Sequence, residues 1–378
     1  MAGLKRDTFI FLEIFSLEGG IQSYVRDILQ AYVSTVAAGK TRSADVFLLR
    51  DGSECENPLA EFLSLKFYYL KTQWPTLGRL HLAVSLLWHF FRHRPHRVFC
   101  GHINLAPLVR LLCSPFGITY IVLTYGKEVW EPLPRPYQKA LRQAAQIWTI
   151  SRYSRDRACV SNRLDPQKFQ ILPCAVSGDT FQPGEKSPKL LQRYGLADAK
   201  VLMTVARLWS GDIYKGVDVT IRAISIIAQS FPNVKYLVIG RGDDQPRLQA
   251  LAAAEGMADR VVFAGFVPTP DLPAHFRLAD AYIMPSQEGF GIVYLEAMAC
   301  GVPVLAGDAD GSAEPLQDGK LGWQVPHRNP EAVAAACIEI LQGSDRRSDG
   351  KWLREMTLAN FGIAAFTARL EQLLDVRG

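Results

Sequence analysis

The sequence lacks a long apolar run and any paired cysteine motif, and each absence excludes a class of protein. No stretch reaches the roughly 18 uninterrupted apolar residues of a membrane-spanning helix. The apolar stretch Thr8–Phe15 is too short for a signal peptide. The seven cysteines are odd in number and include no C-x-x-C pair, which indicates reduced, packed thiols. We therefore expect a cytoplasmic protein.

Low-complexity tracts are also absent, so the composition is that of a globular protein. Apolar residues make up 48% and charged residues 21% of the chain, which excludes the disordered and fibrous classes. A length of 378 residues exceeds what one hydrophobic core usually organises, and two domains are expected.

The positive charge is concentrated in the first half of the chain. Residues 1–185 hold 22 Lys and Arg against 15 Asp and Glu, whereas residues 186–378 hold 20 against 22. A basic half indicates an anionic partner, either a phosphorylated acceptor or an anionic bilayer surface. A solvated basic face without a partner is the alternative.

Short apolar runs alternate with helical patterns along the whole chain, which predicts parallel sheets with crossover helices. We predict two doubly wound α/β domains, residues 1–183 and 184–378, joined at the polar segment Phe181–Pro188. The amphipathic segment 361–376 is a candidate to pack back on the first domain. The predicted strands are Thr8–Phe15, Ala44–Leu49, Arg97–Cys100, Tyr120–Thr124, Ile147–Ile150, Lys168–Leu172, Lys200–Val205, Lys235–Ile239, Arg260–Phe263, Ala281–Met284, Pro303–Ala306 and Gly322–Val325.

The most informative segment is a glycine-rich loop that opens a helix. Glu288–Gly291 follows a predicted strand, and the helix Ile292–Cys300 is expected to end at a cap on Gly301. Such a loop directs free N–H groups and the positive end of the helix dipole to one point beyond the strand ends. That point suits a phosphate.

Two carboxylates bracket this loop, Glu288 before it and Glu296 one turn into the helix. An ionised carboxylate accepts hydrogen bonds from hydroxyl groups, so a sugar or a ribose is its natural ligand beside a phosphate. The alternative is a solvated Glu288 and a Glu296 paired with a basic neighbour.

The segment Ser286–Val304 resembles the E-G-F-G…L-E-A-M-A-C-G-x-P-V signature of glycosyltransferase family 4. The resemblance implies a GT-B fold, in which two Rossmann-like domains face each other across a donor-binding cleft. Val205-Ala-Arg-Leu208 and Lys215-Gly-Val-Asp218 are similar to family motifs whose Arg and Lys contact the donor diphosphate. Two fixed cations would neutralise the charge on the departing nucleoside diphosphate.

The resemblance also implies contacts in the first half, at the glycines after the first strand and at His102 after the strand Arg97–Cys100. A satisfied surface histidine is the alternative. The implied catalytic residues are His102, Glu288, Arg207 and Lys215. The implied donor-binding residues are Gly19, Gly20, Arg207, Lys215, Phe266, Val267, Glu288, Gly289, Phe290, Gly291, Ile292 and Glu296.

Two segments depart from the family pattern. Tyr125 stands where many relatives have a histidine, and Pro173-Cys-Ala-Val-Ser177 replaces P-N-G-V-D. Both departures lie toward the acceptor side, so the acceptor is left open.

The resemblance predicts a retaining, metal-independent transferase that moves a hexose from a UDP- or GDP-linked sugar to a lipid-linked or polysaccharide-precursor glycan. No cofactor, metal or nucleic acid is expected. Asp308-Ala-Asp310 fits a metal-binding D-x-D pattern, but Arg207 and Lys215 already supply positive charge. The alternatives are an epimerase or phosphorylase of similar fold and a nucleotide-sugar-binding protein. A dinucleotide oxidoreductase is disfavoured because no G-x-G-x-x-G follows the first strand.

The segment from Lys66 to Lys71, with Leu77 to Arg97, combines apolar and aromatic residues with arginines. This composition suits a helix in a bilayer interface, so we expect peripheral contact with an anionic inner membrane face. The alternative is a core-facing stripe with solvated arginines at its end. The arginines are Arg79, Arg92, Arg94 and Arg97, and the stripe would be Leu82, Leu86, Leu87 and Phe90.

Overall fold

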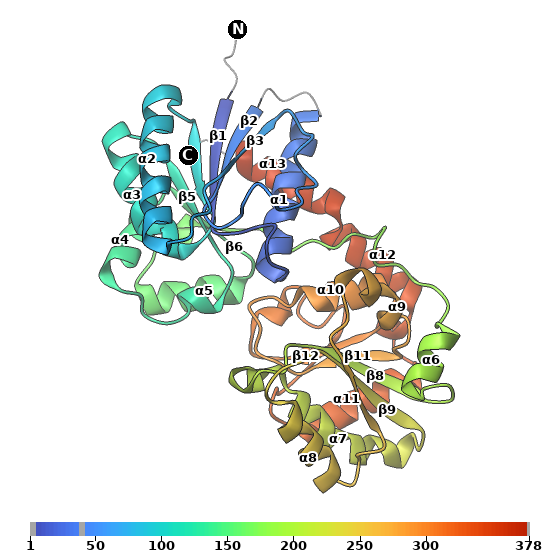
Figure 1. Ribbon diagram of the computed structural model, residues 1–378. Coiled ribbons are helices and arrows are strands. Elements are labelled where there is room, and N and C mark those ends of the chain that lie inside the picture. Colours follow the sequence, from blue (N-terminus) through green and yellow to red (C-terminus); the bar gives the residue numbers. More distant parts are fainter. Residues whose placement is uncertain (1–4, 38–41, 376–378) are drawn as a thin grey trace. The chain divides into compact units, whose positions relative to one another are not determined.

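The structure, a computed structural model, describes residues 5–37 and 42–375 and consists of two compact α/β units (Figure 1). The first unit comprises Met1–Cys174 with Phe366–Gly378, and the second comprises Ala175–Ala365. The boundary that we placed after residue 183 thus lies within the second unit. The last helix belongs mainly to the first.

The first unit is built on a seven-stranded, fully parallel sheet with the order β3-β2-β1-β4-β5-β6-β7. Its strands are β1 (Lys5–Phe11), β2 (Arg42–Leu48), β3 (Leu65–Tyr69), β4 (Arg97–Cys100), β5 (Tyr120–Thr124), β6 (Gln146–Thr149) and β7 (Phe169–Ile171). Its helices are α1 (Gly20–Ala37), α2 (Pro75–His93), α3 (Ala106–Cys113), α4 (Arg135–Gln143), α5 (Arg152–Asn162) and α13 (Ile363–Asp375).

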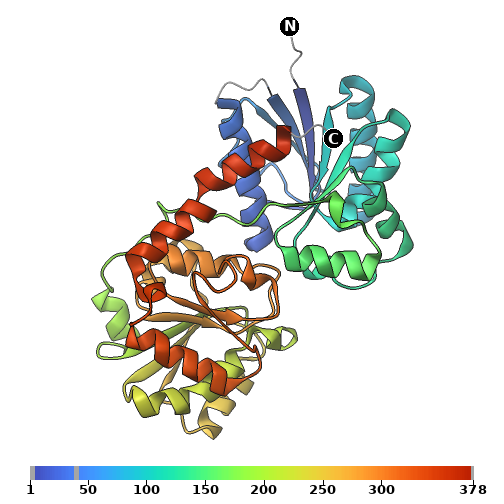
Figure 2. The ribbon, with the colours of Figure 1, turned by 180° about the vertical axis from the view of Figure 1, so that it is seen from behind.

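Helices cover both faces of this sheet, so its strands are apolar on both sides. Helices α2, α3 and α4 lie on one face, and α1 and α13 lie on the other (Figures 1 and 2). On the second face the Phe9 and Phe99 rings stack 4.5 Å apart, and Tyr32 of α1 meets Phe9 edge-on at 5.4 Å. Helix α13 is fixed at its end because the guanidinium of Arg97 donates to the Leu374 carbonyl over 2.9 Å.

The second unit contains a six-stranded parallel sheet with the order β10-β9-β8-β11-β12-β13. Helices α7, α8 and α11 pack on one face, and α9, α10 and α12 lie on the other (Figure 1). The strands are β8 (Lys200–Val205), β9 (Val234–Ile239), β10 (Val261–Gly265), β11 (Ala281–Met284), β12 (Val304–Gly307) and β13 (Trp323–Val325). The helices are α6 (Pro188–Tyr194), α7 (Val217–Ser230), α8 (Gln245–Ala254), α9 (Leu272–Phe276), α10 (Ile292–Ala299), α11 (Pro330–Gln342) and α12 (Gly350–Phe361).

Two doubly wound α/β sheets were predicted, and the structure confirms them. The edge strand β3 was missed, and the expectation that an interfacial helix includes Lys66–Lys71 was wrong for that segment. β3 pairs on one side only, with β2, and its Lys66 is exposed, so it lacks the continuous apolar run of the buried strands. Among the described residues, no helix has both the length and the apolar character that a bilayer crossing requires.

Candidate active site

The charged residues Arg207, Lys215 and Glu288 of the predicted site lie after the carboxyl ends of β8 and β11. After β8 the chain forms a short 3-10 segment, Ser210–Lys215, which ends at Gly216. Gly216 has φ 74°, and a Cβ there would lie 2.5 Å from the carbonyl oxygen of Pro285. Only glycine therefore allows this loop to pack against the loop that follows β11. The ammonium of Lys215 consequently donates a hydrogen bond to Glu288 Oε1.

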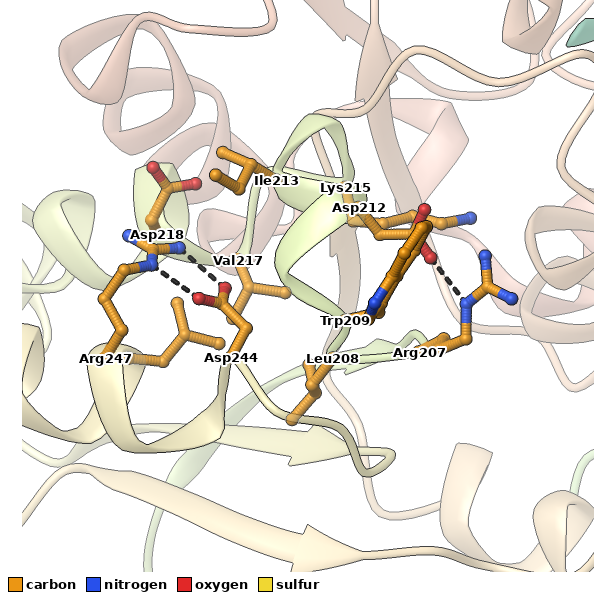
Figure 3. A pocket seen from close by; sticks show the side chains of 11 residues that line it. Arg207, Leu208, Trp209, Asp212, Ile213, Lys215, Val217, Asp218, Asp244 and Arg247 are labelled. Carbon is orange, nitrogen blue, oxygen red and sulfur yellow. Dashed lines mark hydrogen bonds and ion pairs between the residues drawn. The ribbon is translucent and has the colours of Figure 1, made fainter.

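Arg207 lies beside this pair and is held by a buried carboxylate. Its Nε donates to Asp212 Oδ2 over 2.6 Å, and the Arg207 side chain is 67% exposed whereas Asp212 is 4% exposed. The guanidinium also lies 5.4 Å from the centre of the Trp209 ring. Figure 3 shows the charged ends of Arg207 and Lys215 on one side of Trp209. Two cations are thus fixed in one region, with the Arg207 guanidinium still open to solvent.

The loop before α10 depends on close backbone packing. Gly291 has φ 86°, and a Cβ there would lie 2.4 Å from the Tyr294 ring. Gly311 must also be glycine, because a Cβ would lie 2.0 Å from the carbonyl oxygen of Gly289. The Phe290 side chain is buried and packs edge-on against Phe361 at 6.1 Å. The side chain of Phe290 is therefore unavailable to a ligand, and only its backbone can contact one.

Asp310 supports this loop from the other side. Its carboxylate accepts the N–H of Glu288 and that of Ser312, while the N–H of Gly311 donates to the Glu288 carbonyl over 2.8 Å. Burial raises the pKa of Asp310 to about 6. The second carboxylate of the D-x-D pattern is thus engaged in holding the Glu288 backbone. Within residues 5–37 and 42–375, no three His, Cys, Asp or Glu side chains gather as a metal site.

The remaining predicted residues of the second unit differ in exposure. Glu296 lies one turn into α10 and is partly buried. The side chain of Val267 is buried, whereas the Phe266 ring is 55% exposed, and the Arg241 guanidinium lies 4.8 Å from its centre. The N–H of Leu208 donates to the Arg241 carbonyl over 3.1 Å, which joins the segments that follow β8 and β9.

In the first unit, Gly19 and Gly20 lie exposed at the start of α1, and the loop before them is fixed by Asp51. The buried Asp51 carboxylate accepts the N–H groups of Ile14, Phe15 and Ser16 over 2.6–3.2 Å. Because the backbone already satisfies this carboxylate, we read Asp51 as a support for the loop.

His102 follows β4 and lines a cavity of about 190 Å³ together with Glu13, Gln22 and Arg50. Its Nδ1 accepts the N–H of Asn104 over 3.1 Å, so the neutral ring carries its proton on Nε2. Burial lowers the pKa of His102, which favours this neutral donor form.

Tyr125, which replaces the histidine of many relatives, supports the same loop. Its hydroxyl donates to the Gly101 carbonyl over 2.5 Å, and its ring lies 6.5 Å from that of His102. Burial raises the pKa of Tyr125 well above the usual value, so the phenol stays protonated. Tyr125 therefore positions the residue next to His102.

The family model described as "Glycosyl transferases group 1" matches residues 199–343, which hold the Arg207, Lys215 and Glu288 cluster. Across 95% of both chains, the sequence is 31% identical to the GDP-mannose-dependent alpha-(1-6)-phosphatidylinositol monomannoside mannosyltransferase of Mycolicibacterium smegmatis. The protein of the same name from Mycobacterium tuberculosis H37Rv is 33% identical over 94% of both chains. The chain belongs to the group 1 glycosyltransferases.

Further comparisons agree with this assignment. A D-inositol 3-phosphate glycosyltransferase of Geodermatophilus obscurus is 34% identical over 55% of this transferase and 49% of its own length. Among solved structures, Anabaena Alr3699/HepE in complex with UDP has a TM-score of 0.78 at 19% identity, covering 98% of this chain and 100% of its own. That likeness confirms the predicted GT-B fold.

The transferase thus divides its predicted site residues between the units. His102, Gly19 and Gly20 lie in the first unit, and all the others lie in the second. Lys215, which the family resemblance assigns to the diphosphate, donates a hydrogen bond to Glu288, which the resemblance assigns to the sugar. Sequence reasoning missed the supporting residues, namely Trp209, Asp212, Arg241, Asp51 and the structural role of Asp310. No short sequence motif marks these residues, because each contacts a segment distant in the sequence or makes a contact that depends on the fold.

Proposed function

We propose that this glycosyltransferase is a retaining, metal-independent hexosyltransferase that uses a nucleotide diphosphate sugar and a glycolipid acceptor. One observation carries the donor half of this proposal. Arg207 and Lys215 are fixed at the strand ends of the second unit, with Glu288 in contact with Lys215. Two cations beside a carboxylate suit a diphosphate joined to a sugar, because the phosphates need positive charge and the sugar hydroxyls need acceptors.

We assign the diphosphate to Arg207, Lys215 and the amides of Gly289–Ile292. An ammonium has three donors, so Lys215 can contact both Glu288 and a phosphate oxygen. Asp212 binds Nε of Arg207 and leaves the terminal nitrogens as the phosphate contacts. Gly19 and Gly20, at the start of α1, are assigned to the same phosphates.

The hydroxyl groups of the donor go to the remaining polar residues. We assign sugar hydroxyls to Glu288 and His102 and the ribose to Glu296. The nucleotide base is assigned to the Phe266 and Val267 backbone, with the exposed Phe266 ring beside it. In a front-face reaction the leaving phosphate oxygen takes the acceptor proton while the acceptor oxygen bonds to the sugar carbon, so no separate base is required.

GDP-mannose and a phosphatidylinositol mannoside are the substrates that we propose to test first, because the two mycobacterial relatives carry those names. UDP-sugars remain the competing donors. In buffer with excess EDTA, a donor at 100 times its Kd adds about 2.7 kcal/mol to stability and raises the melting temperature. GDP-mannose should give this shift and UDP-glucose should not. A shift that appears only after Mg²⁺ is added would overturn metal independence.

We further propose that α2 of the first unit contacts an anionic membrane. Side chains on its outer face are 40–71% exposed although they are large and apolar, and they recur at helical spacing. They are Leu77, Leu80, Val84, Leu87, Trp88 and Phe91, with Trp74 just before the helix. The exposed cations Arg79 and Arg92 on the same helix supply the complement to anionic headgroups.

The structure corrects two residues in this part of the prediction. Arg97 is buried and pairs with Asp7 over 3.3 Å, so it is unavailable to a membrane. Leu87, which the alternative placed in a core-facing stripe, is exposed, whereas Leu82, Leu86 and Phe90 are fully buried. Helix α2 therefore has apolar residues on two faces, and the core explains only one of them.

Co-sedimentation with vesicles tests the membrane proposal. The protein should bind vesicles that contain phosphatidylinositol or phosphatidylglycerol, and binding should weaken as salt rises, because charged contacts are screened. Neutral phosphatidylcholine vesicles should retain much less protein. Equal and negligible binding to both kinds of vesicle would contradict it.

A further inference from the structure

A second cavity in the first unit lies at the beginning of α2. It has a volume of about 250 Å³ and is lined by residues from the loops after β1, β2 and β4, from the segment after β3, and from the N-terminal part of α2. Three of the lining residues are cations, Arg50, Lys71 and Arg79, and no acidic residue lines it. A cavity with this lining favours an anionic ligand.

The three cations differ in how strongly they are already engaged. Arg50 pairs with Glu13 over 3.0 Å, and Lys71 pairs with Glu54 over 2.6 Å. The side chains of Arg50, Lys71 and Glu54 are at least half exposed, whereas that of Glu13 is largely buried. Ion pairs that are exposed on both sides contribute little, so Lys71 can exchange the Glu54 carboxylate for a ligand at small cost, whereas Arg50 is held more firmly by the largely buried Glu13. Arg79 has no hydrogen bond or ion pair with any residue that the structure describes. It is therefore the first cation that an anion would meet.

This cavity adjoins the cavity that His102 lines. Leu12, Arg50 and Asn104 line both. Asn104 also donates its N–H to His102 Nδ1, which ties the shared wall to the histidine. A ligand whose anionic group lies at Arg79 can thus extend toward His102 within the first unit.

We infer that this cavity binds the phosphate group of the acceptor, with Arg79 as its principal contact and Arg50 and Lys71 beside it. The inference rests on the proposed function, because it places the acceptor hydroxyl toward His102. The ligand class is a phosphorylated polyol. Its source is either the headgroup of a membrane lipid or a free polyol phosphate. The exposed apolar face of α2 begins beside Arg79, so the cavity suits a headgroup held at the bilayer surface.

The first experiment measures binding without turnover, by titration calorimetry with D-inositol 3-phosphate and with unphosphorylated inositol. Arg79→Gln should weaken binding of the phosphate by about tenfold, since it removes a charge-assisted hydrogen bond. Arg135→Gln, an exposed arginine at the start of α4 in the same unit and outside the cavity, is the matched control and should bind as the unchanged protein does. Inositol should bind equally weakly to all three proteins.

The second experiment separates the two sources of the phosphate. Transfer from GDP-mannose is measured with a phosphatidylinositol mannoside in vesicles and with its deacylated, water-soluble headgroup. Arg79→Gln should raise KM for both acceptors. A rise confined to vesicles would place Arg79 at the bilayer surface and overturn the cavity assignment, as would unchanged calorimetry. If the unchanged protein transfers no mannose to either acceptor while Arg79→Gln still loses affinity for D-inositol 3-phosphate, the proposed function is refuted and the phosphate site is supported.

Discussion

The two units use their charged residues in different ways. In the second unit the cations that we assign to the donor are bound to carboxylates, as Arg207 is to Asp212 and Lys215 is to Glu288. In the first unit, Arg79 and Arg92 are exposed on a helix that also presents large apolar side chains. The second unit therefore resembles a pre-organised site for a small ligand, whereas the first presents a surface for an extended anionic one.

Short sequence motifs describe the site of the second unit better than the surface of the first. The donor-side positions are constrained by the backbone, since Gly216, Gly291 and Gly311 each sit where a Cβ would collide with a neighbour. A surface such as the outer face of α2 requires only that apolar and basic side chains be exposed, so no fixed sequence motif is needed there.

The largest expected effect comes from removing a cation of the second unit. Arg207→Ala and Lys215→Ala should each lower kcat/KM by about 100-fold or more, because each removes charge stabilisation of the leaving diphosphate. Steady-state kinetics with varied donor measures this. Arg222→Ala, which loses only a surface pair with Glu255, is the control. Activity near that of the control in either variant would remove the basis for the diphosphate assignment.

A smaller loss is expected from Gly216→Ala. The added Cβ cannot coexist with the Pro285 carbonyl at 2.5 Å, and φ 74° is itself strained for alanine. We expect Lys215 to be displaced from Glu288 and kcat/KM to fall by up to about 100-fold. Gly256→Ala, at a similar φ of 69° but with open space around it, controls for the backbone strain alone. Equal activity of the two variants would show that the contact with Pro285 does not position Lys215.

The corresponding change in the first unit acts on membrane binding. Trp88→Ser combined with Phe91→Ser should reduce binding to anionic vesicles by about tenfold, because it removes apolar area from the interface. Donor affinity should not change. Leu63→Ser with Val160→Ser is the control, since both residues are exposed and apolar but lie outside α2. Equal loss in the two double variants would mean that α2 is not the contact.

The smallest effect concerns the pH dependence of stability. Burial raises the pKa of Asp310 from 3.8 to about 6, so the native state holds this proton more tightly than the unfolded state. The stabilisation is full below pH 3.8 and is lost as pH rises through 6. Its slope is less than about 1.4 kcal/mol per pH unit. Asp310→Asn keeps an acceptor for the Glu288 N–H and should flatten the unfolding free energy between pH 4 and 6, measured in urea. An unchanged slope would contradict the shift.

The architecture could be predicted from the sequence, because alternating apolar runs and glycine positions are local signals. The residues of the donor site stay a prediction, of which the structure brings Arg207, Lys215 and Glu288 together. Strand ends differed from prediction by a few residues at most sites. The burial of Arg97 was not predictable, because it depends on β1 bringing Asp7 beside β4. The support of the β1–α1 loop by Asp51 likewise arises only when separate segments have packed, and the contact of Asp212 with Arg207 depends on the turn that the chain makes after β8. The exposed face of α2 was expected only as one of two alternatives, since spacing alone does not distinguish a core stripe from an outer one.

We propose that the second unit supplies a metal-free site for a nucleotide diphosphate sugar and that the first receives a phosphorylated lipid acceptor. The most direct test incubates the protein with GDP-mannose and a phosphatidylinositol mannoside in vesicles with excess EDTA, and determines the product by NMR. We expect one added mannose with the α configuration of the donor, and no product with Lys215→Ala. A β-linked product, a requirement for added Mg²⁺ or Mn²⁺, or release of free mannose alone would contradict it.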